Sequence, residues 1–375
     1  MKPVSSIFFI TMILGLGLIM MTNKTTAQQN CTDETVMNTK GGWKKRADAL
    51  MNAGNQGQAI SHIDAISKLF QTAYPEPKGM EAGWYRTMHG NSLINNGPIP
   101  YQFNSLFLAW YCNSNVNKLE LSGETGTWAY AFVNSFNWFI SRQYDLLLIK
   151  VKGEDVYILP PVKGEWKGYP LYQASSHGDK GRCIILTHNN KVPWKPITQE
   201  QYLQALRDFW KKQKQASDDS YIKQEENLKK SITDIQNNKY LKQADKDKII
   251  AGLEKELAEL PEKKATSIAK SDKYWNDKFS ILDKYISQNA SSLQQPAIID
   301  NQVAGDFKGN FSTLEKGGQM LITIDPGYFN MQLPRYAAQM IVLYWRWDSN
   351  SPGLNFKKEF EQNFPVDKLK AMIDK

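Results

Sequence analysis

The sequence predicts an α+β fold, in which an antiparallel sheet with N- and C-terminal helices carries a long, charged, coiled-coil-like helical hairpin as an insertion. Short aromatic runs with β propensity, separated by turn residues, fill the chain between Trp84 and His188. A highly charged stretch with apolar residues three and four positions apart follows, up to about Ala290. The composition, 41% hydrophobic and 12% aromatic, provides enough apolar mass for a packed core.

The first 27 residues have the pattern of a secretory signal peptide. Lys2 precedes an apolar run over residues 7–21, and Thr25-Thr26-Ala27 places small residues at the −3 and −1 positions. We expect cleavage after Ala27, which exports the mature protein to the periplasm or the extracellular medium. The alternative is an uncleaved membrane anchor, but the run is shorter than the ~20 apolar residues of a spanning helix. No second long apolar run follows, so the mature chain is predicted to lack a membrane span.

The charge is mildly basic. The formal net charge of +8 falls to +6 when Lys2 and Lys24 leave with the signal peptide. Such an excess is compatible with binding to anionic envelope polymers, including a glycan. No segment resembles a nucleic-acid-binding module, so we expect no nucleic-acid partner.

Three cysteines allow one disulfide and leave one thiol over. Cys112 and Cys183 both lie in apolar, strand-like contexts, and we predict the bridge between them. The alternative is that both are reduced core residues, because a free cysteine packs as a small hydrophobe. Cys31 lies four residues into the mature chain, where we expect it to be mobile.

The N-terminal part of the body combines helices with short strands. Residues 43–73 have helical spacing interrupted at residues 54–57, which predicts two short helices packed as a hairpin and ended by Pro75 and Pro77. The turn Gly153-Glu154-Asp155, between the strands predicted over residues 146–151 and 156–159, predicts a β-hairpin. The predicted strands cover residues 105–112, 118–121, 128–133, 146–151, 156–159 and 183–187.

One predicted strand separates aromatic from small side chains. Trp128, Tyr130 and Phe132 alternate with Ala129, Ala131 and Val133, so the two sets should lie on opposite faces. The aromatic face is either a platform for stacking sugar rings or, as we favour, a surface packed on the helices.

A charged helical arm follows, over residues 198–290. Thr198 and Gln201 have the spacing of a capping box, so a long helix should begin at Gln199 and end at Asn237-Asn238. A second helix is predicted over residues 244–260 and, after Pro261, a third over 262–288. Residues 200–290 contain 18 basic and 16 acidic side chains, a balance typical of a solvated, self-paired helical surface. The arm is either a contact surface for a protein partner or a spacer.

The last part of the chain should complete the body. Strands are predicted over residues 320–324 and 337–347, rejoining the central sheet, and one or two helices over 356–373. The predicted organisation is therefore a signal peptide (1–27), an aromatic-rich α+β body (28–197), the arm (198–290) and C-terminal strands and helix that complete the body (291–375).

No motif in the sequence names a reaction. None of the four histidines has metal-ligand spacing, and neither a nucleophile elbow nor a phosphate-binding glycine loop is present, so we predict no catalytic residue, metal or cofactor. The one compact polar cluster covers residues 81–90, where Trp84, Arg86 and His89 are candidates for a ligand cleft. A salt bridge beside a buried tryptophan is the alternative explanation.

Two segments carry a resemblance to a protein family. The stretch ILTHNNKVPWKPITQEQYLQAL, within residues 183–206, and the stretch DPGYFNMQLPRYAAQMIVLYWRW resemble a family of exported bacterial proteins that has no assigned activity. The resemblance covers about the last half of the chain. It implies a sheet strand that leads into a charged helical arm and returns, and it implies no catalytic residues.

These observations lead to two hypotheses. The first is a non-enzymatic secreted or envelope protein whose helical arm makes protein contacts. The alternative is a protein that binds or hydrolyses envelope carbohydrate, using the aromatic strand that contains Trp128 or the loop from Trp84 to His89.

Overall fold

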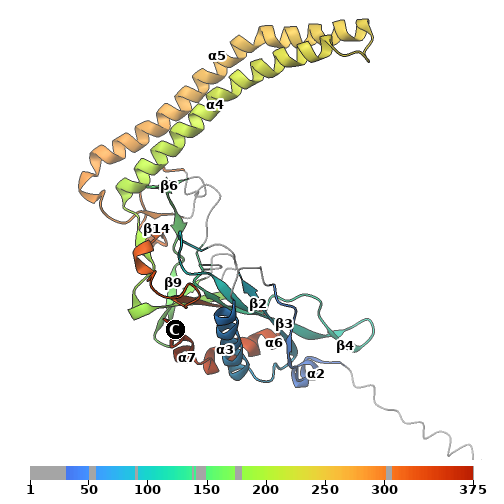
Figure 1. Cartoon of the computed structure of the whole chain (residues 1–375), viewed down its shortest axis with the longest axis vertical. Coiled ribbons are helices and arrows are strands. Elements are labelled where there is room, and N and C mark those ends of the chain that lie inside the picture. The colour runs from blue at the N-terminus through green and yellow to red at the C-terminus, as the bar shows by residue number, and fades with distance from the viewer. Residues whose placement is uncertain are drawn as a thin grey trace, which may run out of the picture.

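A computed structural model describes residues 31–49, 56–88, 92–136, 139–140, 149–173, 180–300 and 306–374. Helices account for 43% and strands for 26% of the described residues, which confirms the predicted α+β class. Figure 1 shows a body built around a sheet, from which one helical hairpin projects. The predicted signal peptide lies outside the described residues.

The body is organised by a nine-stranded sheet, antiparallel except for the pairing of its first two strands. Its strands, in spatial order, are β1 (Trp43–Lys45), β2 (Met80–Met88), β3 (Tyr101–Asn113), β5 (Trp128–Val133), β15 (Met340–Arg346), β11 (Gly181–Thr187), β10 (Tyr169–Gln173) and β9 (Val162–Trp166), with β4 (Lys118–Leu121) paired to β3. β15 lies between β5 and β11, so a strand that follows the arm in sequence completes the centre of the sheet.

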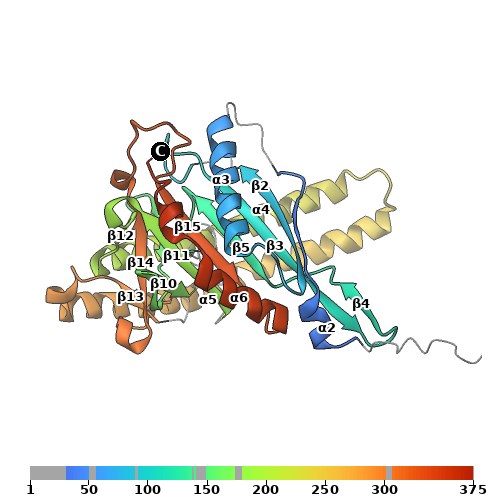
Figure 2. The same cartoon turned by 90° about the horizontal axis from the view of Figure 1, so that it is seen from below.

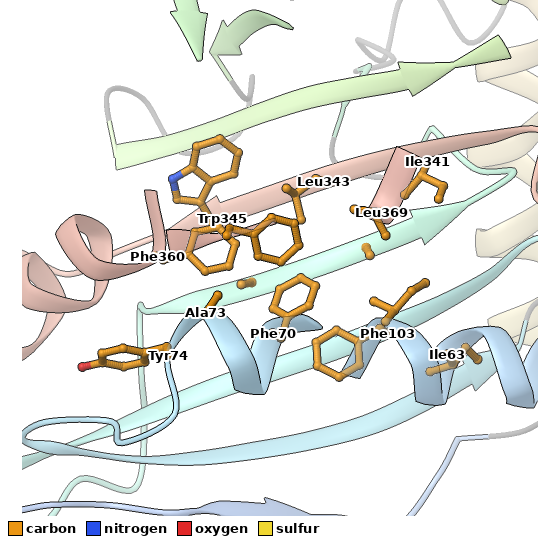
Figure 3. Close-up of a cluster of buried hydrophobic side chains, with 14 of the residues drawn as sticks. Ile63, Phe70, Ala73, Tyr74, Phe103, Ile341, Leu343, Trp345, Phe360 and Leu369 are labelled. Atoms are coloured by element: carbon orange, nitrogen blue, oxygen red, sulfur yellow. The ribbon is translucent and has the colours of Figure 1, made fainter. Parts of the chain in front are cut away.

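Helices cover one face of this sheet. They are α2 (Asp33–Asn38), α3 (Gly57–Ala73), α6 (Ser351–Asn363) and α7 (Val366–Lys370), and Figure 2 shows α3 and α6 lying across the strands. The core beneath them is aromatic, with the ring centroids of Phe70 and Phe103 4.5 Å apart and those of Phe360 and Trp345 5.8 Å apart (Figure 3). N- and C-terminal helices thus share one hydrophobic core.

The first of the two helices predicted within residues 43–73 is not present in residues 43–49, the part of it that the structure describes. Residues 43–45 form β1, which runs parallel to β2 with Trp43 opposite Ala82. The Trp43 indole also donates a hydrogen bond to the carbonyl of Tyr74 at 2.9 Å. Pairing with a neighbouring strand overrides the local helical spacing here. The second predicted helix is present as α3.

A small second sheet packs on the opposite face. It contains β12 (Trp194–Pro196), β14 (Gln319–Ile324), β13 (Ile298–Ile299) and β8 (Tyr157–Ile158). Tyr130 and Phe132 are buried with Trp194 and Ile322 of this sheet, whereas Ala129 and Ala131 lie in the core beneath the helices. The predicted separation of aromatic and small side chains is confirmed, but the prediction that the aromatic face packs on the helices is wrong. The strand predicted over residues 320–324 is present as β14. The prediction that it joins the central sheet is wrong, because it belongs to the small sheet.

The remaining elements are short. A hairpin of β6 (Lys150–Val151) and β7 (Glu154–Asp155) turns at Gly153. The strand predicted as its second arm, residues 156–159, instead contains β8 and pairs with β14 of the small sheet. The 3-10 helices are η3 (His188–Asn190), η4 (Ala290–Ser292), η5 (Leu314–Lys316) and η6 (Pro326–Tyr328).

The disulfide joins Cys31 to Cys112, with their Cα atoms 5.4 Å apart. The predicted Cys112–Cys183 bridge is therefore wrong, and so is the expectation that Cys31 is mobile. Cys183 is a free thiol, fully buried in β11 among the aromatic side chains beneath the small sheet. Burial raises the pKa of this thiol, so it stays protonated and unreactive.

Candidate functional site

The most prominent surface feature is the arm, an antiparallel pair of helices that leaves the body beside the small sheet (Figure 1). It consists of α4 (Gln199–Gln236) and α5 (Gln243–Gln288). The predicted capping box is present: the Thr198 hydroxyl accepts from the backbone N–H of Gln201, and the Gln201 side chain accepts from that of Thr198. At 1.5 Å per residue, α4 is about 57 Å long. The arm therefore extends well beyond the body.

The base of the arm belongs to the body. Leu203, Leu206 and Trp210 of α4 and Leu282 of α5 are fully or almost fully buried in one cluster that also contains Leu321 of β14. The ammonium group of Lys278 lies 4.7 Å from the centre of the Trp210 ring and forms a 2.8 Å ion pair with Asp306. These contacts fix the direction in which the arm leaves the body.

Beyond this base, few side chains of the shaft are fully buried. Among the described side chains of residues 211–281, only Leu228 and Leu260 are buried. Lys214 bridges the two helices through a 2.7 Å ion pair with Asp272. Exposed pairs four residues apart, such as Lys229–Glu225 at 2.6 Å, lie along single helices. Part of the shaft's charge is thus paired within the arm.

The second helix of the arm is continuous. α5 runs through Pro261, so the predicted division into helices over 244–260 and 262–288 is wrong. Proline has no N–H to donate to the carbonyl of Leu257, and its ring crowds that turn. Packing of Leu260 in the seam between the helices compensates, and the arm curves in Figure 1 rather than breaking.

The tip of the arm, residues 237–242, differs from the shaft. Tyr240 is 98% exposed, the most exposed large hydrophobic side chain in the described part of the chain. Its backbone N–H donates to the Asn238 side chain at 2.8 Å, and Lys246 donates to the last carbonyl of α4, that of Gln236, at 3.0 Å. The turn is thereby ordered, and the tyrosine is held in solvent.

Charge at the tip is unbalanced. Residues 237–248 contain four lysines and two aspartates. Lys239 and Lys242, on either side of the tyrosine, are exposed and form no ion pair within the described residues. An aromatic side chain flanked by unpaired cations is therefore presented far from the body.

The cluster predicted as a ligand cleft lies on a strand, not in a loop. Trp84 and Arg86 belong to β2, and His89 lies outside the described residues. Arg86 is 15% exposed and bonds two carboxylates, Asp64 at 3.0 Å and Asp48 at 3.7 Å. The positive charge of Arg86 is therefore already compensated within the body. This agrees with the alternative explanation of the cluster, a salt bridge beside a tryptophan, rather than with a ligand cleft.

A cavity of about 220 Å³ that the sequence did not indicate lies beside η3. The His188 ring is in hydrogen-bond contact with the Asp374 carboxylate, and the backbone N–H of His188 donates to the hydroxyl of Tyr328 at 3.0 Å. Burial raises the pKa of Tyr328 to about 12, so this hydroxyl remains protonated. None of the described lining residues is a serine, threonine or cysteine, so the histidine has no nucleophile there to activate.

Comparisons with known proteins returned no match to a family model, a curated protein or a solved structure. In the described ranges, no helix combines the length and the apolar character required to cross a bilayer. The same ranges contain no group of three His, Cys, Asp or Glu side chains placed to hold a metal ion.

Proposed function

We propose that this chain is an exported, non-enzymatic protein that binds a protein partner through the tip of its helical arm. The observation that carries the proposal is the fully exposed Tyr240 at the end of a hairpin about 57 Å long. Holding a large aromatic ring in water brings no stability to the chain itself. Tyrosine is also among the residue types that contribute most to protein interfaces.

The tip suits this role better than the shaft. Several shaft charges, such as Lys214 with Asp272 and Lys263 with Glu259, are paired with one another, and a partner would have to break those pairs before making its own. Lys239 and Lys242 have no such partner within the described residues. Their charge favours a partner with an acidic surface, and it would increase the association rate at low salt.

Export is part of the proposal and rests on two observations. The first 27 residues have the pattern of a signal peptide, and Cys31 forms a disulfide with Cys112. Disulfides persist in oxidising compartments and are rare in the cytosol. The periplasm and the extracellular medium both meet this condition, and the family of exported bacterial proteins suggested by the sequence would share it.

Site-specific photo-crosslinking in the producing cell tests the proposal. A photoreactive phenylalanine analogue replaces Tyr240 in one variant and Tyr274 in a matched control. Tyr274 is also an exposed tyrosine of the arm, 53% accessible, but lies near the base. We expect position 240 to give one discrete protein adduct that position 274 does not give.

Charge provides a second test of the same adduct. Lys239→Glu combined with Lys242→Glu should abolish it, whereas Lys270→Glu, on the exposed surface of the shaft, should leave it unchanged. Equal adducts from positions 240 and 274, or no protein adduct from position 240, would show that the tip is not the binding site.

A further inference from the structure

A cleft at the far end of β3, distinct from the arm, has the chemistry of a ligand site. It has a volume of about 400 Å³, within the ~300–1,000 Å³ of small-molecule sites. Its walls come from the ends of β3 and β15, from the loop between β4 and β5, and from the loop that leads into α6. Strands that are distant in sequence but separated in the sheet by β5 alone therefore build it together.

Two nitrogen atoms of the cleft residues have no hydrogen-bond partner in the described part of the chain. Trp110 Nε1 and Arg346 Nε are both buried, and among the described residues neither donates to any acceptor. Arg346 also forms no ion pair in that part of the chain, and its guanidinium lies 5.0 Å from the centre of the Trp128 ring. A buried, unpaired donor costs about 1–3 kcal/mol, and a ligand oxygen that reached either nitrogen would recover part of that cost.

Carboxylates line the same cleft. Asp348 is fixed, because one of its oxygens accepts from the backbone N–H of Gly126 at 2.8 Å. A β-carbon at Gly126 would lie 2.1 Å from the other oxygen, so only glycine permits this approach. Glu124 contributes a second carboxylate from the neighbouring loop and is exposed. The cleft therefore offers acceptors as well as donors.

From this combination we infer that the cleft binds a neutral saccharide. The two carboxylates disfavour an anionic ligand, and Arg346 disfavours a cationic one. A sugar hydroxyl both donates and accepts hydrogen bonds, so it can pair with the nitrogen donors and with the carboxylate acceptors of the cleft. The C–H face of a sugar ring also packs on an aromatic ring such as Trp110. Both nitrogens lie beneath the surface of the cleft, so a ligand reaches either one only if the Trp110 or Arg346 side chain turns toward it.

Calorimetric titration of the disulfide-bonded chain with cellotetraose, maltotetraose and tetra-N-acetylchitotetraose tests this inference. At least one of these neutral tetrasaccharides should bind saturably. Trp110→Ala should weaken that binding by at least about thirtyfold, and Trp110→Phe, which keeps a ring but loses the N–H, by about tenfold. Trp84→Ala, a tryptophan of β2 that does not line the cleft, should have no effect.

An NMR measurement keeps the test valid if Trp110→Ala fails to fold. The indole N–H signal missing from Trp110→Phe identifies Trp110 in the unmodified chain, and the bound tetrasaccharide should shift it. Three results would overturn the inference: no tetrasaccharide binds, only the charged tetragalacturonate binds, or Trp84→Ala weakens binding as much as Trp110→Ala.

Discussion

Cys112 lies in β3 and Cys183 in β11, and the sheet places β5 and β15 between these two strands. With strands about 4.8 Å apart, three strand spacings exceed the ~7 Å Cα separation that a disulfide tolerates. The apolar context of both cysteines is a local property, whereas the strand order is a property of the whole sheet. Sequence context therefore placed both cysteines on strands correctly and paired them wrongly.

The bridge should matter for stability, because it closes a loop of about 80 residues between Cys31 and Cys112. Cys31→Ser should lower the free energy of unfolding by about 2–4 kcal/mol, since the unfolded chain regains the freedom that the bridge removes. Chemical denaturation under non-reducing conditions measures this. Adding reductant should destabilise the unmodified chain by a similar amount and leave Cys31→Ser unaffected. If reductant has no effect on the unmodified chain, the bridge carries no stability.

Residues of the candidate sites differ in how far the sequence could reveal them. Arg86 was singled out because an acid, a base and aromatics lie close together in sequence, yet two aspartates from other segments neutralise it. Trp110 and Arg346 gave no signal, because an unpaired donor is defined by what surrounds it in the fold. Tyr240 lies between helices that the sequence did predict, but its 98% exposure is a property of the folded hairpin.

At the scale of elements, long and strongly patterned segments were predictable. The capping box at Thr198 fixed the start of α4, and β5 covers the predicted residues 128–133. Errors occurred where tertiary contacts override a local rule. β1 forms because β2 offers a parallel partner, and α5 continues through Pro261 because its apolar seam is packed against α4.

This seam predicts how the shaft responds to mutation. Leu260 is 4% exposed, and Leu260→Ala should destabilise the arm by about 2–3 kcal/mol through lost burial and a residual cavity. Amide hydrogen exchange should then accelerate in the shaft and stay unchanged in β3, β5 and β15. Ile249→Ala, at a 40% exposed position of the same helix, is the control and should have little effect. Faster exchange throughout the sheet in Leu260→Ala would contradict an independently unfolding shaft.

At the scale of the molecule, the arm is two regions with different energetic roles. Its base shares a buried cluster with β14, whereas the shaft beyond Trp210 adds little to any described core. The segment predicted from composition, residues 198–290, does not distinguish these regions, because charge is spread over both. The division depends on which apolar residues meet the small sheet.

Two truncations therefore should behave differently. Replacing residues 215–271 with a four-residue Gly/Ser loop keeps the Lys214–Asp272 ion pair and the base of the arm. Replacing residues 199–288 removes Leu203, Leu206, Trp210 and Leu282 and exposes the apolar surface they cover. We expect the first variant to melt within about 2 °C of the full chain in scanning calorimetry, and the second to melt at least about 10 °C lower or not to fold. The difference follows from burial alone, since both variants lose the tip. Equal melting temperatures for the two variants would mean that the base contributes no more to the body than the shaft does.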